Sequence, residues 1–112
     1  MSHPSRKSSF YLTKLFGSSV NIKILEILLR NALEEQIEGK TLWRNFSNIA
    51  SQAKVAKSSG KRILDQLLQN DFVEEKIIET HAQSPPRMVR LNSEHPAVVE
   101  LIFFFKKVRG FL

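Results

Sequence analysis

The chain has 112 residues, with 17 lysines and arginines against 11 aspartates and glutamates, so its formal net charge is +6. This length allows one domain with one core, and 42% hydrophobic against 25% charged residues excludes a disordered or low-complexity chain. The absence of cysteine excludes disulfide scaffolds and thiolate zinc sites, and it makes a reducing cytoplasm the expected location. No apolar run approaches the roughly 18 residues that span a membrane, so we expect a soluble protein without a membrane partner.

The positive charge is concentrated in one stretch of the sequence. Residues 41–62 carry two arginines and three lysines without any acid, which gives +5. Residues 63–80 have one lysine against five acids, which gives −4. Such a step predicts that one surface is kept basic, and it favours a polyanionic partner. An ordinary solvated surface is the alternative interpretation.

The first third of the chain predicts two helices. Residues 1–9 are polar and basic and would form a flexible arm. Residues 10–16 have the pattern of a short amphipathic helix, which Gly17 would end. A serine then caps a second helix, expected to continue to about Leu33 with a broad apolar face. The polar residues 34–40 would connect this helix to the next one.

The middle of the chain predicts two helices joined by a short turn. Thr41 would cap a helix reaching about residue 53, with one face formed by Trp43, Phe46, Ile49, Ala50 and Ala53. After the three residues 54–56, another helix from 57 to 70 would direct inward Ile63, Leu64, Leu67 and Leu68. Two helices with so short a connection are typical of a helix-turn-helix unit, here about residues 42–70.

The last third predicts a hairpin and a final helix. Residues 72–80 and 87–92 have strand patterns, and the consecutive prolines 85 and 86 forbid a tight two-residue turn between them. Pro96 would open a helix reaching about Arg109. The expected fold class is mostly α with a small β-hairpin, an α+β fold. Its parts would be an arm (1–9), a domain (10–93) with its hairpin at about 72–92, and a C-terminal helix (94–112).

Three segments together carry a family motif. The longest is Ile49-Ala-Ser-Gln-Ala-Lys-Val-Ala-Lys-Ser-Ser-Gly-Lys-Arg-Ile-Leu-Asp-Gln-Leu-Leu-Gln-Asn-Asp-Phe-Val73, and the flanking ones are Leu15-Phe-Gly-Ser18 followed by Ile24-Leu25, and Arg90-Leu-Asn-Ser-Glu-His-Pro96. They resemble prokaryotic winged helix-turn-helix transcription regulators, and the last segment is similar to archaeal members. The resemblance implies a winged helix-turn-helix fold with extra N- and C-terminal helices. It also implies a protein that binds double-stranded DNA and regulates transcription, most simply as a repressor.

Three positions depart from the family pattern. Lys54 stands where a left-handed glycine is usual, at a cost of about 1 kcal/mol. Ala56 replaces the usual serine or threonine cap of the second helix, which gives up roughly 1 kcal/mol. Gly60 replaces a packed valine, which either lets the two helices approach more closely or weakens the helix by nearly 1 kcal/mol.

The resemblance implies that the N-terminal half of the helix 57–70 enters the DNA major groove, where the helix dipole favours phosphate. The residues expected to contact DNA from this helix are Lys57, Ser58, Ser59, Lys61 and Arg62. The preceding helix and the turn would contribute Arg44, Asn48 and Lys54, and the hairpin would contribute Gln83 and Arg87. Arginines and lysines suit guanine edges and phosphates, and serines suit phosphates or either base.

The C-terminal helix is apolar almost all round, which predicts an interface. One face would cover the domain with Val98, Leu101, Phe105 and Val108. The remaining apolar residues favour a homodimer whose expected contacts are Phe10, Tyr11, Ile102, Phe103 and Phe104. A two-fold dimer would place two recognition helices about 34 Å apart on a pseudo-palindromic site. The alternative is that all these residues pack within one domain.

The sequence lacks recognisable catalytic and cofactor motifs. The three histidines are scattered, and phosphate loops, nucleophile elbows and paired carboxylates are missing. We therefore expect no enzyme, metal, cofactor or small-molecule ligand. Two other interpretations remain open: a winged-helix module that binds proteins through its last helix, and a replication, partition or chromatin protein with little sequence preference.

Overall fold

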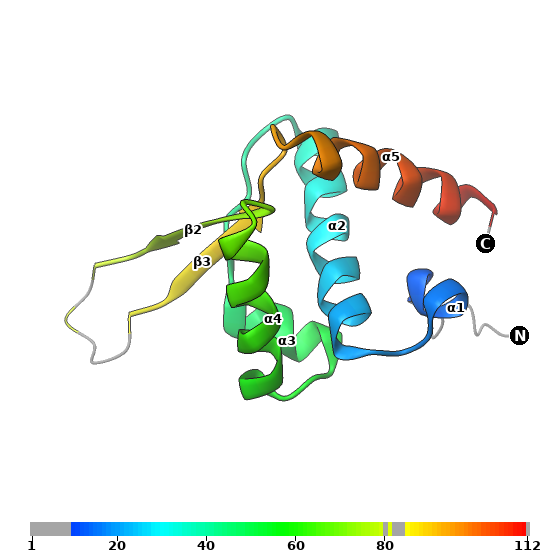
Figure 1. Ribbon diagram of the computed structural model, residues 1–112. Coiled ribbons are helices and arrows are strands. Elements are labelled where there is room, and N and C mark those ends of the chain that lie inside the picture. The colour runs from blue at the N-terminus through cyan, green and yellow to red at the C-terminus, as the bar shows by residue number, and fades with distance from the viewer. Residues whose placement is uncertain (1–9, 80, 82–84, 112) are drawn as a thin grey trace, which may run out of the picture.

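The computed structural model describes residues 10–79, 81 and 85–111, so the expected arm at 1–9 lies outside the described residues. The elements in chain order are α1 (Leu12–Phe16), α2 (Val20–Glu38), β1 (Arg44–Asn45), α3 (Phe46–Ala53), α4 (Lys57–Gln69), β2 (Val73–Ile77), β3 (Arg87–Leu91) and α5 (Pro96–Phe111). α2 runs through the middle, with α3, α4 and the sheet on one side and α1 and α5 on the other (Figure 1). The fold is α+β, as the sequence predicts at that level.

The sheet has three strands in the order β1–β3–β2, and both strand pairs are antiparallel. β2 and β3 form the predicted hairpin, in which Val73 lies opposite Leu91. β1 pairs with the other edge of β3 and places Arg44 opposite Val89. The described part of the hairpin extends away from the helices, from a base that lies beside α4 (Figure 1).

The start of α3 differs from the prediction. Thr41 does not cap the helix, because the chain is extended through β1 and α3 begins only at Phe46. Asn45 is the actual cap: its side-chain oxygen accepts the backbone N–H of Ser47 at 2.8 Å. Trp43 therefore lies outside the helix, and the amino group of Lys76 sits 4.8 Å from its ring centroid. The predicted membership of Trp43 in the helical face is wrong.

α2 is longer than predicted. It begins with Ser19 as its cap and runs through the expected connection to Glu38. Its end is set by Gly39, which adopts a left-handed conformation with φ of 69° and donates its N–H to the Glu35 carbonyl. The stretch 34–40 is thus mostly the last part of α2, and it is exposed from residue 36 onward. Within the part of the chain that the structure describes, no helix combines the length and apolarity needed to cross a membrane.

The core forms around α2. Its fully buried side chains come from every layer of the fold: Ile24, Ile27, Leu28 and Leu29 from α2, Ile49 from α3, Leu64 from α4, Val89 from β3, and Val98 and Phe105 from α5. α4 therefore turns one apolar side toward α2, as its periodicity predicts. The same packing fixes which side of α4 faces solvent.

α1 is attached to α2 by a buried carboxylate. The side chain of Glu26 is completely buried, and its two oxygens accept the backbone N–H groups of Tyr11 at 2.6 Å and Leu12 at 2.7 Å. Arg30, one turn further along α2, lies 3.3 Å from the same carboxylate. Glu26 therefore satisfies N–H groups at the start of α1 that the helix itself leaves unpaired. Nothing in the sequence pattern singled out this residue.

Candidate nucleic-acid interface

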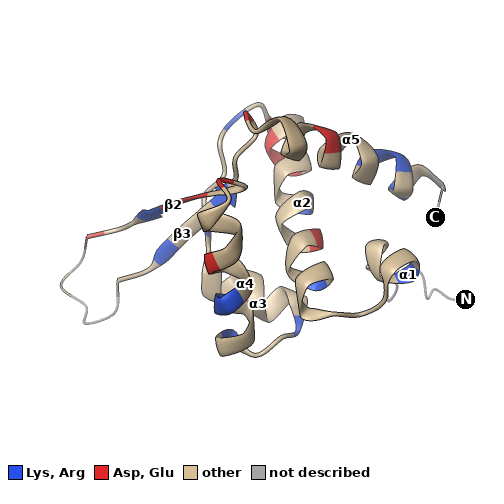
Figure 2. Ribbon diagram, viewed as in Figure 1, with Lys and Arg blue, Asp and Glu red and all other residues tan. Residues whose placement is uncertain are grey.

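The N-terminal half of α4 carries an exposed basic surface. Lys57, Ser58, Lys61 and Arg62 are all exposed, while Ser59 is half-buried. Among the described residues, no carboxylate forms an ion pair with the two lysines or with Arg62. Figure 2 shows these cations on the lower half of α4, with an acidic residue above them. The predicted outward orientation of this face is therefore observed.

The turn before α4 leaves the start of the helix available to an anion. Lys54 ends α3 in a left-handed conformation with φ of 59°, and it is exposed. Ala56 stands at the cap position of α4, where no side chain accepts a hydrogen bond from the first turn. Backbone N–H groups at the start of a helix favour phosphate. Three lysines lie close in sequence to the start of α4: Lys54, Lys57 and Lys61.

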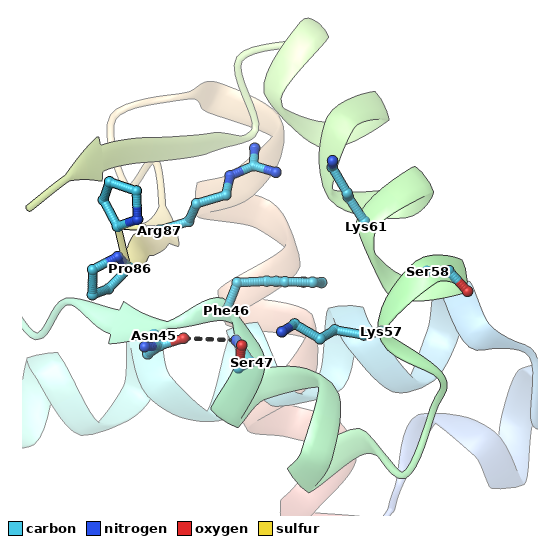
Figure 3. Close-up of a pocket in the computed structure, with 9 residues that line it drawn as sticks. Asn45, Phe46, Ser47, Lys57, Ser58, Lys61, Pro86 and Arg87 are labelled. Carbon is cyan, nitrogen blue, oxygen red and sulfur yellow. Dashed lines mark hydrogen bonds between the residues drawn. The ribbon is translucent and has the colours of Figure 1, made fainter. Parts of the chain in front are cut away.

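A groove lies between α4, the start of α3 and the loop end of β3. It has a volume of about 480 Å³ and is lined by Asn45, Phe46, Ser47, Lys57, Ser58, Lys61, Pro85, Pro86 and Arg87. Figure 3 shows Lys57 reaching from α4 toward Ser47, and Lys61 and Arg87 extending toward each other from opposite walls. Three cationic side chains from two elements thus converge on one hollow. This arrangement can hold one or more phosphate groups.

Arg87, the predicted hairpin contact, is held by two carboxylates. It donates to Glu75 across the hairpin, and a guanidinium nitrogen lies 3.5 Å from the carboxylate of Asp65 in α4. The hydrogen bond that Arg87 donates to Glu75 is the main cause that raises the pKa of Arg87, and Asp65 adds to it against the effect of burial. Arg87 therefore ties the hairpin to α4, and much of its charge is neutralised. Gln83, the other predicted hairpin contact, lies outside the described residues.

The residues expected to contact DNA from α3 and the following turn do not all lie where they were expected. Arg44 was predicted to lie on the helix, but it belongs to β1 and pairs with Glu34 of α2. That prediction is wrong because α3 starts two residues later. Asn48 and Lys54 are exposed at the two ends of α3, as a backbone contact would require. Sequence reasoning missed Ser47 and the prolines, which line the groove.

Acidic residues of the stretch 63–80 form ion pairs with the arginines of β3. Arg90 forms two hydrogen bonds with Glu35, both at 2.8 Å, and one with Glu74 at 2.7 Å. Glu35 is the main cause that raises the pKa of Arg90, with Glu74 adding to it. Three acids of residues 63–80 therefore pair with hairpin arginines and not with the lysines of α4 (Asp65, Glu74 and Glu75).

The predicted dimer residues do not form one surface. Ile102 is only 5% exposed and belongs to the core, so the expectation that it faces outward is wrong. It points the same way as Val98 and Phe105, which cover α2. Phe10 and Tyr11 are half-buried against the core. Of the predicted contacts, only Phe103 and Phe104 are exposed large hydrophobic residues.

Comparison of the chain with protein-family models, with curated proteins and with solved structures found no match. The interface described above therefore rests on the geometry and chemistry of this chain. Among the described residues, no group of three or more histidine, aspartate or glutamate side chains is placed to hold a metal ion.

Proposed function

We propose that this chain is a winged helix-turn-helix protein that binds double-stranded DNA and regulates transcription. The order α2, β1, α3, α4, β2, β3 supports the proposal, because it places a helix-turn-helix unit directly before a hairpin whose base packs beside its second helix. The edge strand β1 supports it further, since it joins the hairpin to the chain just before α3. The resemblance of residues 49–73 to winged-helix regulators agrees with this order.

One observation carries the proposal: the cations on α4, which pair with no carboxylate of the described residues, lie at or beside the groove next to the hairpin. Lys57 and Lys61 line that groove, and Arg62 stands exposed next to them. α4 has 13 residues, so it is about 20 Å long and can cross a major groove. A duplex lying here meets positive charge from α4 and a helix start without a side-chain cap.

Each basic residue has a proposed task on DNA. Lys57 and Lys54, near the helix start, would neutralise phosphates and fix the position of the protein on the duplex. Lys61 and Arg62 project one turn further along, where a recognition helix reads base edges, and guanine is the base that their side chains recognise best. Arg87 would contribute weakly, because Glu75 and Asp65 already compensate its charge.

Selection of bound sequences from random duplex DNA tests this function. A regulator of transcription should enrich a defined motif, and a two-fold dimer should enrich an inverted repeat. A featureless pool of bound DNA would contradict the regulator and favour a replication, partition or chromatin protein with little sequence preference. Absence of any bound DNA would contradict nucleic-acid binding altogether.

A matched pair of variants assigns the binding to α4. Lys61→Ala should weaken binding to the selected motif by about 1–3 kcal/mol and relax the base preference at one position. Lys40→Ala removes the same charge from an exposed residue beyond the end of α2, and it should leave the motif unchanged. Equal effects of both substitutions would show that α4 is not the reading helix.

A further inference from the structure

An exposed stripe on α5 is left uncovered by the residues that the structure describes. Phe103 is 55% exposed and Phe104 is 41% exposed, and Glu100 and Lys107 are exposed on the same side. Positions 100, 103, 104 and 107 follow the three- and four-residue spacing that places side chains on one helix face. The opposite face is buried in the core through Val98, Ile102, Phe105 and Val108. We call the outward face, formed by Glu100, Phe103, Phe104 and Lys107, the α5 stripe.

The apolar surface continues from the α5 stripe onto α1. The ring centroids of Phe16 and Phe104 are 6.3 Å apart, which joins the two helices at the surface. Phe16 is 58% exposed and Leu15 beside it is 49% exposed. Several adjacent large hydrophobic residues in contact with water are typical of an interaction site on a protein surface. The buried carboxylate of Glu26 fixes the position of α1, and with it the position of Leu15 and Phe16.

The charge pattern of the α5 stripe is complementary to itself. Glu100 and Lys107 lie equally far from the midpoint between Phe103 and Phe104, one on each side. When two such helices pack antiparallel about that midpoint, the glutamate of each copy faces the lysine of the other. The four phenylalanines then meet in the centre between two ion pairs. A two-fold interface requires this kind of self-complementarity.

We propose that the α5 stripe is the interface with a second copy of this chain, packed antiparallel to the first. Glu100 pairs with Lys107 of the second copy, and Phe103 and Phe104 form the apolar centre, with Leu15 and Phe16 at its margin. An acidic lipid surface fits less well, because Glu100 at one end of the α5 stripe would be repelled by it. An acidic peptide is disfavoured for the same reason.

The α5 stripe is small for the interface of an obligate dimer. α5 has 16 residues and is about 24 Å long, and only its outward side with the exposed end of α1 takes part. The surface on this side is smaller than the interfaces of obligate dimers, which bury roughly 2,000 Å² or more. The dimer should therefore dissociate on dilution, in contrast to an interface that resembles a protein core.

The position of α5 leaves the candidate DNA interface uncovered. α5 packs on the side of α2 away from α4 and the hairpin (Figure 1). Pairing through the α5 stripe gives each dimer two copies of the α4 surface, related by a two-fold axis. The dimer itself does not depend on DNA binding, and only its consequence for an inverted-repeat site rests on the proposed function.

Sedimentation velocity of the full chain without DNA, measured across a concentration series, tests the proposal. The wild type should show a reversible monomer–dimer equilibrium. Glu100→Lys and Lys107→Glu should each yield monomers, because each places like charges opposite one another. The double variant Glu100→Lys/Lys107→Glu should recover the dimer, since the exchanged pair is again complementary in an antiparallel arrangement. Circular dichroism establishes that each variant is folded.

Two controls make the result decisive. Glu94→Lys reverses the charge of an exposed residue before α5 and should dimerise like the wild type. Phe103→Ala should weaken the dimer at least tenfold without changing any charge. A wild type that stays monomeric up to roughly 100 µM overturns the proposal, because an interface of this size should associate more tightly than that. So does a double variant that fails to recover, or a monomer whose α5 stripe binds anionic vesicles instead. Because these measurements contain no DNA, their failure is distinct from failure of the proposed function.

Discussion

Gly60 in α4 lies against the ring of Phe46 in α3, so that a Cβ on Gly60 would stand 3.1 Å from Cζ of Phe46. Both residues are buried, and Ile24 and Val55 approach the same point. Gly60→Val should lower the free energy of unfolding by about 1–3 kcal/mol, because overpacking outweighs the gain in helix propensity. Urea denaturation measures the difference. Gly110→Ala, where nothing lies within 4 Å, should not destabilise the protein, and equal stability of both variants would contradict the close contact of α3 and α4.

Glu26→Gln tests the attachment of α1. The amide retains one oxygen acceptor and turns a donor toward the second backbone N–H, so one buried hydrogen bond is lost and the other loses its charge. The free energy of unfolding should fall by about 1–3 kcal/mol. Amide exchange of Tyr11 and Leu12 should accelerate more than that of the core of α2. Unchanged exchange at these two amides would show that the carboxylate does not hold α1.

Asp65→Asn should strengthen DNA binding. Asp65 lies one turn beyond the reading residues of α4, and it also partly neutralises Arg87. Its removal lowers the negative charge near the duplex and makes Arg87 more available, so affinity should rise roughly threefold to tenfold at low salt. Because the Asp65 side chain is 56% exposed, stability should change by less than about 1 kcal/mol. Unaltered or weaker binding would place the duplex away from this side of α4.

Lys54→Gly separates a folding effect from a binding effect. The left-handed conformation of Lys54 costs a side chain about 1 kcal/mol relative to glycine, so the variant should be more stable by about that amount. If Lys54 contacts phosphate, the same variant should reduce the salt dependence of DNA binding by about one unit of slope per subunit. Asp71→Gly is the matched control, since Asp71 is also left-handed with φ of 62° but follows α4 at its far end. It should gain stability while its salt dependence stays unchanged.

Sequence patterns located the elements that hydrophobic periodicity and local turn chemistry determine. α4 was predicted almost to the residue because its apolar side is regular and Asn70 follows it. The hairpin was predicted by its β-branched residues and by the two prolines that enforce a wide loop. The exposed lysines of α4 follow from the same periodicity, since residues between the inward positions must face solvent.

The features that the sequence did not predict depend on contacts between distant residues. β1 has only two residues and is a strand only because β3 lies beside it. α2 continues past Leu33 because polarity does not end a helix, whereas Gly39 does. The neutralisation of Arg90 by Glu35 joins residues 55 positions apart, which no local pattern reveals. The ion pairs of Arg87 with Glu75 and Asp65 also join distant residues, so the sequence did not show that this expected hairpin contact is largely neutralised.

The salt dependence of duplex binding tests the central claim most directly. If a dimer neutralises about eight phosphates through the α4 surfaces, the logarithm of affinity should fall with the logarithm of salt concentration at a slope near −7. The variant Lys61→Ala/Arg62→Ala should lose several kcal/mol of binding per dimer and show a shallower slope, whereas Lys40→Ala should match the wild type. Binding without salt dependence, or an α4 variant that binds like the wild type, would contradict the proposal that this surface holds DNA.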